Sequence, residues 1–90
     1  MNADVLESII QAQLPAAARG DAAAYGRIVA GCQGMVTAIA LSIVRDVPTS
    51  EDIAQDAFIS AWQNLRKLGN PSSFLPWLRQ ITRNLARDHL

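Results

Sequence analysis

The side chains best suited to chemistry in this sequence lie near its C-terminal end. Arginines recur there every four residues with amides between them, and a short loop of asparagine and serines precedes them. The set is Asn70, Ser72, Ser73, Arg79, Gln80, Arg83, Asn84 and Arg87. Guanidinium groups bind phosphates, whereas amides and hydroxyls hydrogen-bond base edges. The pattern therefore predicts a nucleic-acid contact, and an ordinary solvated helix face is the alternative.

A second candidate set is acidic and comes earlier in the chain. It consists of Glu51, Asp52, Gln55 and Asp56. Residues one helical turn apart project from one side of a helix, so these groups could meet a basic partner helix. A solubilising face with favourable charges near a helix N-terminus explains the same residues. Their spacing does not separate the two interpretations.

The net charge conceals a division between the two ends of the chain. Eight basic and eight acidic residues give a formal charge of zero, which at face value counts against a nucleic-acid binder. Residues 1–65, however, hold three basic and seven acidic groups, a net −4, and residues 66–90 hold five basic groups and one acid, a net +4. Such asymmetry is typical of interaction surfaces. Two mutually attracting solvated faces would also produce it.

Catalysis finds little support in the sequence. His89 is the only histidine and has no neighbouring nucleophile, and no glycine-rich phosphate loop or metal motif is present. Cys32 is the only cysteine, which excludes an internal disulfide and a cysteine-cluster zinc site. It lies on an apolar stripe and is predicted to be a core residue in a reducing compartment. We expect no enzyme activity, metal or cofactor.

Helical spacing of apolar residues prevails throughout, so the fold class is predicted to be all-α, a compact bundle of three to four helices. The helices are expected over residues 4–18, 22–44 and 50–67, followed by a fourth helix that Ser72 or Ser73 caps. Residues 1–18 would form an N-terminal helix and residues 19–90 the domain proper. The last helix is still amphipathic at Leu90, which suggests a fragment of a longer protein.

Several local signals set the expected helix ends. Pro15 should kink or interrupt the first helix. Gly20 and Asp21 read as the stop of that helix and the N-cap of the next. Thr49 is the expected N-cap of the third helix, with Asp52 completing a capping box.

The predicted second and fourth helices carry further expectations. In the second, Gly26, Gly31 and Gly34 predict tight helix packing. Its uncharged stretch from residue 28 to 44 is near the minimum for a membrane span, and a helix buried in a bundle is the preferred interpretation. In the fourth, the arginines should point outward. The residues expected to face inward are Phe74, Trp77, Leu78, Ile81 and Leu85.

Four sequence segments in order resemble region 2 of the extracytoplasmic-function (ECF) group of bacterial RNA polymerase sigma factors. They are Arg19-Gly20-Asp21 with Ala24-Tyr25, the run 51–58 followed by Trp62, the run 74–78, and the run 81–88. The resemblance covers about four fifths of the chain. The chain departs from the family pattern at Thr49-Ser50, where Asp-Ala is common, and at Thr82, where Ala is common.

The resemblance implies a cytoplasmic promoter-recognition subunit and assigns both sets of residues. Asp52, Gln55 and Asp56, with Glu51 beside them, would bind the clamp helices of the polymerase β′ subunit. The loop and last helix, with all the basic and polar residues named above, would recognise the minus-ten promoter element, capture a flipped base of the non-template strand and help to melt the duplex. An anti-sigma factor is a candidate further partner, and no membrane contact is implied.

The resemblance also implies a second, helix-turn-helix domain that this chain does not contain. The isolated chain is therefore expected to bind promoter DNA poorly. A helical protein–protein interaction module without DNA binding is the alternative function, with the arginines meeting an acidic partner. A small helical enzyme is a more distant alternative.

Overall fold

A computed structural model describes residues 2–90, and within that range the chain is helical without strands. The elements are α1 (Ala3–Ala18), α2 (Ala22–Val44), α3 (Val47–Asn64), the 3₁₀ turns η1 (Leu65–Lys67) and η2 (Pro71–Ser73), and α4 (Phe74–His89). This confirms the all-α prediction.

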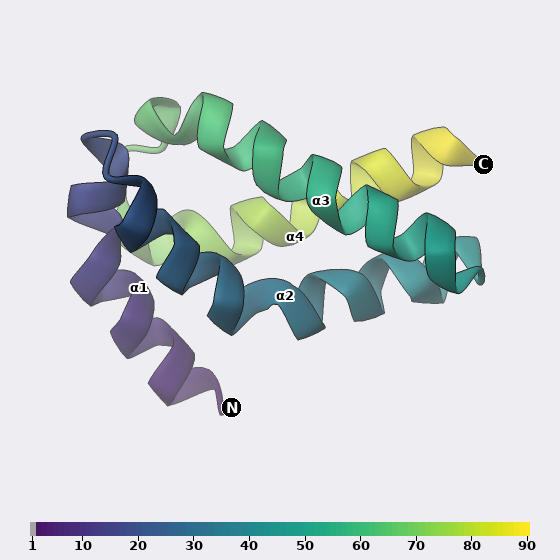
Figure 1. The fold of residues 1–90 in the computed structure, drawn as a ribbon, viewed down its shortest axis with the longest axis horizontal. Coiled ribbons are helices and arrows are strands. Elements are labelled where there is room, and N and C mark those ends of the chain that lie inside the picture. Colours follow the sequence, from purple (N-terminus) through teal and green to yellow (C-terminus); the bar gives the residue numbers. More distant parts are fainter. Residues whose placement is uncertain (1) are drawn as a thin grey trace.

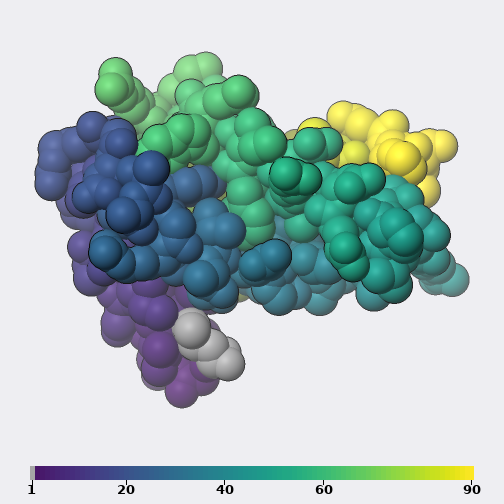
Figure 2. Space-filling view, viewed as in Figure 1, coloured from purple at the N-terminus to yellow at the C-terminus, as the bar shows by residue number. Residues whose placement is uncertain are grey.

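The helices α2, α3 and α4 pack against one another in all three pairings, and α1 packs across one end of α2. In Figure 1, α2 and α3 lie towards the viewer and α4 lies behind them. The space-filling view from the same side shows α2 and α3 covering most of α4, whose yellow C-terminal end emerges beyond α3 (Figure 2). The exposed side of α4 therefore faces away from α2 and α3.

The turn between α1 and α2 follows the sequence prediction. Gly20 adopts a φ of 100°, which favours glycine, and the Asp21 carboxylate accepts a hydrogen bond from the Ala24 backbone N–H at 3.1 Å. The helix before it runs through Pro15 to Ala18 as one element, so this proline does not end it. Its exposed ring lies outside the core.

Helix α2 is long and apolar enough to cross a membrane by length and composition. In the bundle it buries one face, formed by Ala24, Tyr25, Ile28, Cys32, Val36 and Ala40. The packing expected of its glycines is wrong at two positions. Gly26 and Gly34 are exposed, and a methyl group added at either would meet nothing within 4 Å.

The third helix begins earlier than predicted. Asp46, rather than Thr49, is the N-cap, and its carboxylate accepts hydrogen bonds from the backbone N–H and the hydroxyl of Thr49. These bonds from Thr49 hold the pKa of Asp46 below its usual value. Pro48 fits inside the first turn because the N–H it lacks would have no helical partner there. The expected capping box with Asp52 is therefore absent from this helix start.

The start of α4 and part of its buried face differ from the prediction. Ser73 occupies the N-cap position without a side-chain hydrogen bond. Phe74 and Leu78 are fully buried as expected, and Trp77, Ile81 and Leu85 are partly buried and pack against the core. The prediction missed Leu75, Thr82 and Ala86, which are buried as well. Thr82 is accommodated because its hydroxyl donates to the Leu78 carbonyl at 2.8 Å. The side of α4 that carries Thr82 and Ala86 therefore faces the core more directly than the prediction had it.

Candidate functional site

A groove of about 700 Å³ runs between α2 and α3, on the side of the bundle away from α4. Its lining comes from one face of each helix: Ala22, Tyr25, Val29, Gln33 and Thr37 of α2, and Glu51, Ala54, Gln55, Phe58, Ile59, Trp62 and Gln63 of α3. The α2 residues recur at three and four, so the groove follows the helix axis for several turns.

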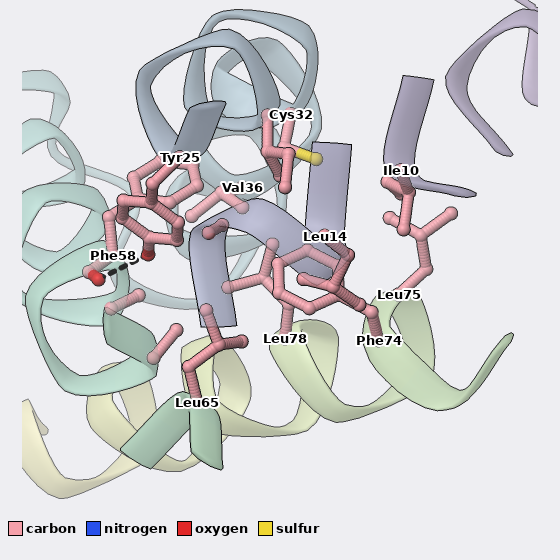
Figure 3. Packing of buried hydrophobic residues seen from close by; sticks show 14 of the residues in the cluster. Ile10, Leu14, Tyr25, Cys32, Val36, Phe58, Leu65, Phe74, Leu75 and Leu78 are labelled. Atoms are coloured by element: carbon pink, nitrogen blue, oxygen red, sulfur yellow. Dashed lines mark hydrogen bonds between the residues drawn. The ribbon is translucent and has the colours of Figure 1, made fainter. Parts of the chain in front are cut away.

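Aromatic residues join the two helices at the floor of the groove. The rings of Tyr25 and Trp62 lie 4.7 Å apart between centroids, and the Tyr25 hydroxyl donates a hydrogen bond to the Phe58 backbone carbonyl (Figure 3). Burial, with a smaller contribution from Cys32, raises the pKa of Tyr25 well above its usual value. This hydroxyl therefore stays protonated and acts as a structural donor.

The predicted acidic residues divide between the groove and its rim. Glu51 and Gln55 line the groove, whereas Asp52 and Asp56 are exposed on the outer side of α3 next to it. Ile59, with 47% of its surface exposed, adds an apolar group at the edge. The structure thus brings carboxylates together with an apolar floor, a combination suited to an amphipathic helix with basic residues along one edge.

The sequence predicts the charged residues of this candidate site but not the groove beside them. Tyr25, Val29, Gln33 and Thr37 recur every four residues, and that spacing could have marked one wall. The other wall belongs to a different helix, and the pairing of the two is visible only in the fold.

Removing the Tyr25 hydroxyl should destabilise the fold, because it contributes a hydrogen bond at the floor of the groove. We expect Tyr25→Phe to lower the free energy of unfolding by about 1 kcal/mol at neutral pH, because the bond to the Phe58 carbonyl is lost. Chemical denaturation measures this difference. An unchanged free energy of unfolding would contradict the contribution assigned to this bond.

The same variant should change the response to alkaline pH. A tyrosine whose pKa is raised by folding contributes stability that is lost as the pH rises above its unfolded value, about 10. Burial also raises the pKa of the Cys32 thiol, to about 11, so this group acts in the same direction. Tyr25→Phe should therefore reduce the alkaline loss of stability without abolishing it. Identical pH profiles would contradict this account.

The basic and polar residues surround η2 and the outer side of α4, and the structure separates them by exposure. Gln80, Asn84 and Arg87 are exposed on α4, while Arg79 and Arg83 are half-buried at its flank. Four residues rotate about 40° past one full turn of an α-helix. Residues spaced by four therefore shift gradually around the helix axis rather than forming a straight line. Of the three arginines expected to point outward, Arg87 is exposed, and Arg79 and Arg83 are partly exposed.

Arg79 lies close enough to α2 to act on a buried group there. Its positive charge lowers the pKa of Cys32, against the larger opposite effect of burial and alongside a small increase from Glu7 of α1. The exposed surface carries the amides and Arg87.

The two amides of α4 form a pair. Gln80 Nε2 donates to Asn84 Oδ1 at 2.8 Å, across one turn of the helix. This bond leaves the Asn84 amide N–H groups and the Gln80 carbonyl oxygen facing water on an exposed surface. A donor and an acceptor held side by side match the edge of a base.

Some hydrogen-bonding groups of the loop are already used within the turn η2. Asn70 Oδ1 accepts from the backbone N–H of Ser72 at 3.0 Å and from its hydroxyl at 2.9 Å, so Asn70 caps η2. Ser73 is exposed and makes no side-chain cap. The Asn70 amide nitrogen and the Ser73 hydroxyl are the groups of this loop that the turn does not use.

The described residues 2–90 contain no cluster of three or more histidine, cysteine or acidic side chains that could hold a metal ion. His89 is exposed at the end of α4, and Cys32 is buried with a raised pKa, which disfavours the reactive thiolate.

Known proteins are similar to this chain over most of its length. The sigma-70 region 2 family matches residues 28–90. The chain is 64% identical over 90 residues to a probable RNA polymerase sigma factor, RfaY, of Xanthomonas campestris pv. campestris, covering all of this chain and 22% of that protein. It is 35% identical over 72 residues to the RNA polymerase sigma-H factor of Pseudomonas aeruginosa, covering 80% of this chain and 37% of the relative.

A third relative extends the comparison to the ECF group. The ECF RNA polymerase sigma factor SigW of Bacillus subtilis is 29% identical over 85 residues, which cover 94% of this chain and 46% of that protein. The chain therefore spans less than half the length of each of these three relatives. With the family match over residues 28–90, these findings show that the chain belongs to the sigma-70 region 2 family, as the helical domain of an ECF sigma factor.

Proposed function

We propose that this domain joins the RNA polymerase core to promoter DNA and helps to open the promoter at the minus-ten element. The observation that carries the proposal is the placement of two chemically different surfaces on opposite sides of one small bundle. An apolar groove with carboxylates lies between α2 and α3, and exposed amides with an arginine lie on α4 behind them.

The polymerase side is the groove with its acidic rim. An amphipathic helix can bury its apolar face on Tyr25, Phe58 and Trp62 while basic side chains meet Asp52 and Asp56. The resemblance to ECF factors supports the clamp helices of the β′ subunit as this partner. The groove adds apolar contact area to a site that the sequence describes only by its charges.

The DNA side is η2 with the outer surface of α4. Arg83 and Arg87 hold the phosphate backbone, while Asn84, Gln80 and Ser73 hydrogen-bond the bases of the non-template strand. An extruded base offers its whole edge to such groups, which a paired base does not. Melting then needs only tighter binding to the open strand than to the duplex.

Binding of single-stranded DNA by the assembled holoenzyme tests this function. Polymerase core with the sigma factor that contains this chain should enrich particular sequences from a random single-stranded library, whereas core alone should not. Affinity for an enriched sequence should fall with salt, because each released phosphate counterion contributes a slope of about −0.7. Arg87→Ala should reduce that slope by about this amount.

The alternative interaction module without a DNA role gives a different result. If the arginines meet an acidic protein, the holoenzyme should enrich no sequence beyond what core alone enriches. That outcome would contradict the proposed DNA function and leave the groove as a protein-binding site. Holoenzyme that enriches a sequence but keeps its salt slope in Arg87→Ala would remove Arg87 from the interface.

A further inference from the structure

Helix α1 contacts the polar loop as well as α2. Its closest packing is along α2, but it also packs against η2, the turn that contains Ser72 and Ser73. The matched family segment begins at residue 28 and therefore does not include α1. A helix outside that segment thus supports the turn that the proposed function places on DNA.

Two apolar contacts hold this junction together. Figure 3 shows Ile10 of α1 pointing towards Leu75, and Leu14 lying beside the ring of Phe74. Ile10 and Phe74 are fully buried, and Leu14 and Leu75 are 4% exposed. Phe74 and Leu75 directly follow Ser73, so the contact with α1 fixes the chain where the loop becomes α4.

The hydrogen bonds of the loop act locally. The Asn70 side chain accepts from Ser72, and the Phe74 backbone N–H donates to the Pro71 carbonyl, which joins η2 to the first residue of α4. A methyl group added at Gly69, just before them, would meet nothing within 4 Å. The apolar junction with α1 adds a contact between this turn and a separate helix.

The core behind the loop joins side chains of three helices. Leu14 of α1, Cys32 of α2 and Phe74 of α4 belong to one buried cluster. Cys32 and Phe74 are fully buried there. The junction with α1 is therefore continuous with the core that α2 and α4 share.

We propose that α1 is a positioning element for the DNA-facing loop, acting through Ile10 and Leu14. In this arrangement α1 sets the place of Ser72 and Ser73 relative to the amides of α4. The structural part of the inference is independent of DNA, and its consequence for promoter recognition rests on the proposed function.

Hydrogen exchange on the full chain tests the positioning directly. We expect Ile10→Ala to speed exchange of the Ser72, Ser73 and Phe74 amides by about tenfold, because a buried contact beside them is lost. Ile53→Ala is the matched control. Ile53 is 5% exposed in a separate cluster with Ala40 and Ala86, so its loss should speed exchange there and leave the loop amides unchanged. If Ile10→Ala unfolds the chain, Ile10→Val and Ile53→Val provide the same comparison with a smaller change.

The holoenzyme provides the second measurement. Ile10→Ala should lower the preference for an enriched single-stranded DNA over a scrambled one by about tenfold and leave the affinity for polymerase core within about twofold. Loop amides that exchange no faster in Ile10→Ala than in Ile53→Ala would overturn the positioning role. A loosened loop in a factor whose wild type prefers no sequence would support the positioning role and overturn the proposed DNA function.

Discussion

Reversing the charges of Asp52 and Asp56 together, to arginine, should weaken binding of this domain to the polymerase core by about a hundredfold, close to 2.7 kcal/mol. Both carboxylates are exposed on α3 beside the groove, so the substitutions place two repulsive groups at the rim that a basic partner helix would meet. Binding of labelled domain to polymerase core, measured by fluorescence anisotropy, gives the difference.

A double variant with the same total charge separates a local effect from a general one. Asp4→Arg with Asp88→Arg also adds four units of positive charge, but at exposed positions on α1 and at the end of α4. Its affinity for core should stay within about threefold of wild type, because screened charges away from a contact contribute little. Equal losses in the two double variants would show that overall charge controls binding. No loss at Asp52 and Asp56 would remove α3 from the interface.

Because Asp52 and Asp56 are exposed, reversing their charges should not unfold the domain. Neither aspartate caps a helix, since Asp46 holds the start of α3, and surface substitutions away from such features usually change stability by less than about 0.5 kcal/mol. A sequence-based placement of the N-cap at Thr49 would have put Asp52 in the first turn, where its reversal would also oppose the helix dipole. The observed cap moves it into the second turn.

That difference illustrates what the sequence predicts well and where tertiary structure decides. The start of α2 and the Gly20–Asp21 turn follow from local signals, because glycine at positive φ and aspartate at an N-cap have few competitors. The start of α3 was predicted at Thr49 and lies instead after Asp46. Asp46 is the N-cap because its carboxylate accepts from both the backbone N–H and the hydroxyl of Thr49, a pairing that is visible only in the structure.

The buried side of α4 and the groove between α2 and α3 also depend on tertiary structure that the sequence does not show. Apolar periodicity assigned Trp77, Ile81 and Leu85 to the interior of α4, yet Thr82 and Ala86 are the deeper residues. Small residues let α4 approach α2 and α3 closely, and hydropathy gives them little weight. The groove was missed for a related reason, since its walls come from two helices and its floor from the contact between them.

Asn84→Ala should reduce transcription from a cognate promoter by about tenfold to a hundredfold while leaving core binding unchanged. A side-chain amide that bonds a base contributes about 1–3 kcal/mol of discrimination, and Asn84 is exposed on α4. Transcription in vitro and core affinity, measured on the same preparation, give the two values. Gln11→Ala on exposed α1 is the matched control and should change neither.

Asn84→Ala should change DNA contacts without changing the stability of the fold. Alanine has the highest helix propensity, so replacing an exposed asparagine in mid-helix should not destabilise α4. The bond from Gln80 is lost, but its amide is exposed and water replaces the acceptor. Equal losses of transcription and core binding would therefore indicate misfolding and contradict the assignment of Asn84 to DNA.

The Gln80–Asn84 hydrogen bond makes a further distinction possible. If Gln80 acts by holding Asn84 in place, Gln80→Ala and Asn84→Ala should not be additive, and the double variant should resemble Asn84→Ala alone. If each amide meets its own base, the losses should add. Asn84→Asp keeps the acceptor for Gln80 but removes the amide donors and adds a negative charge. It should therefore impair transcription at least as much as alanine, because a base edge and a nearby phosphate both disfavour that charge. Activity close to wild type in Asn84→Asp would show that the amide donors of Asn84 do not contact DNA.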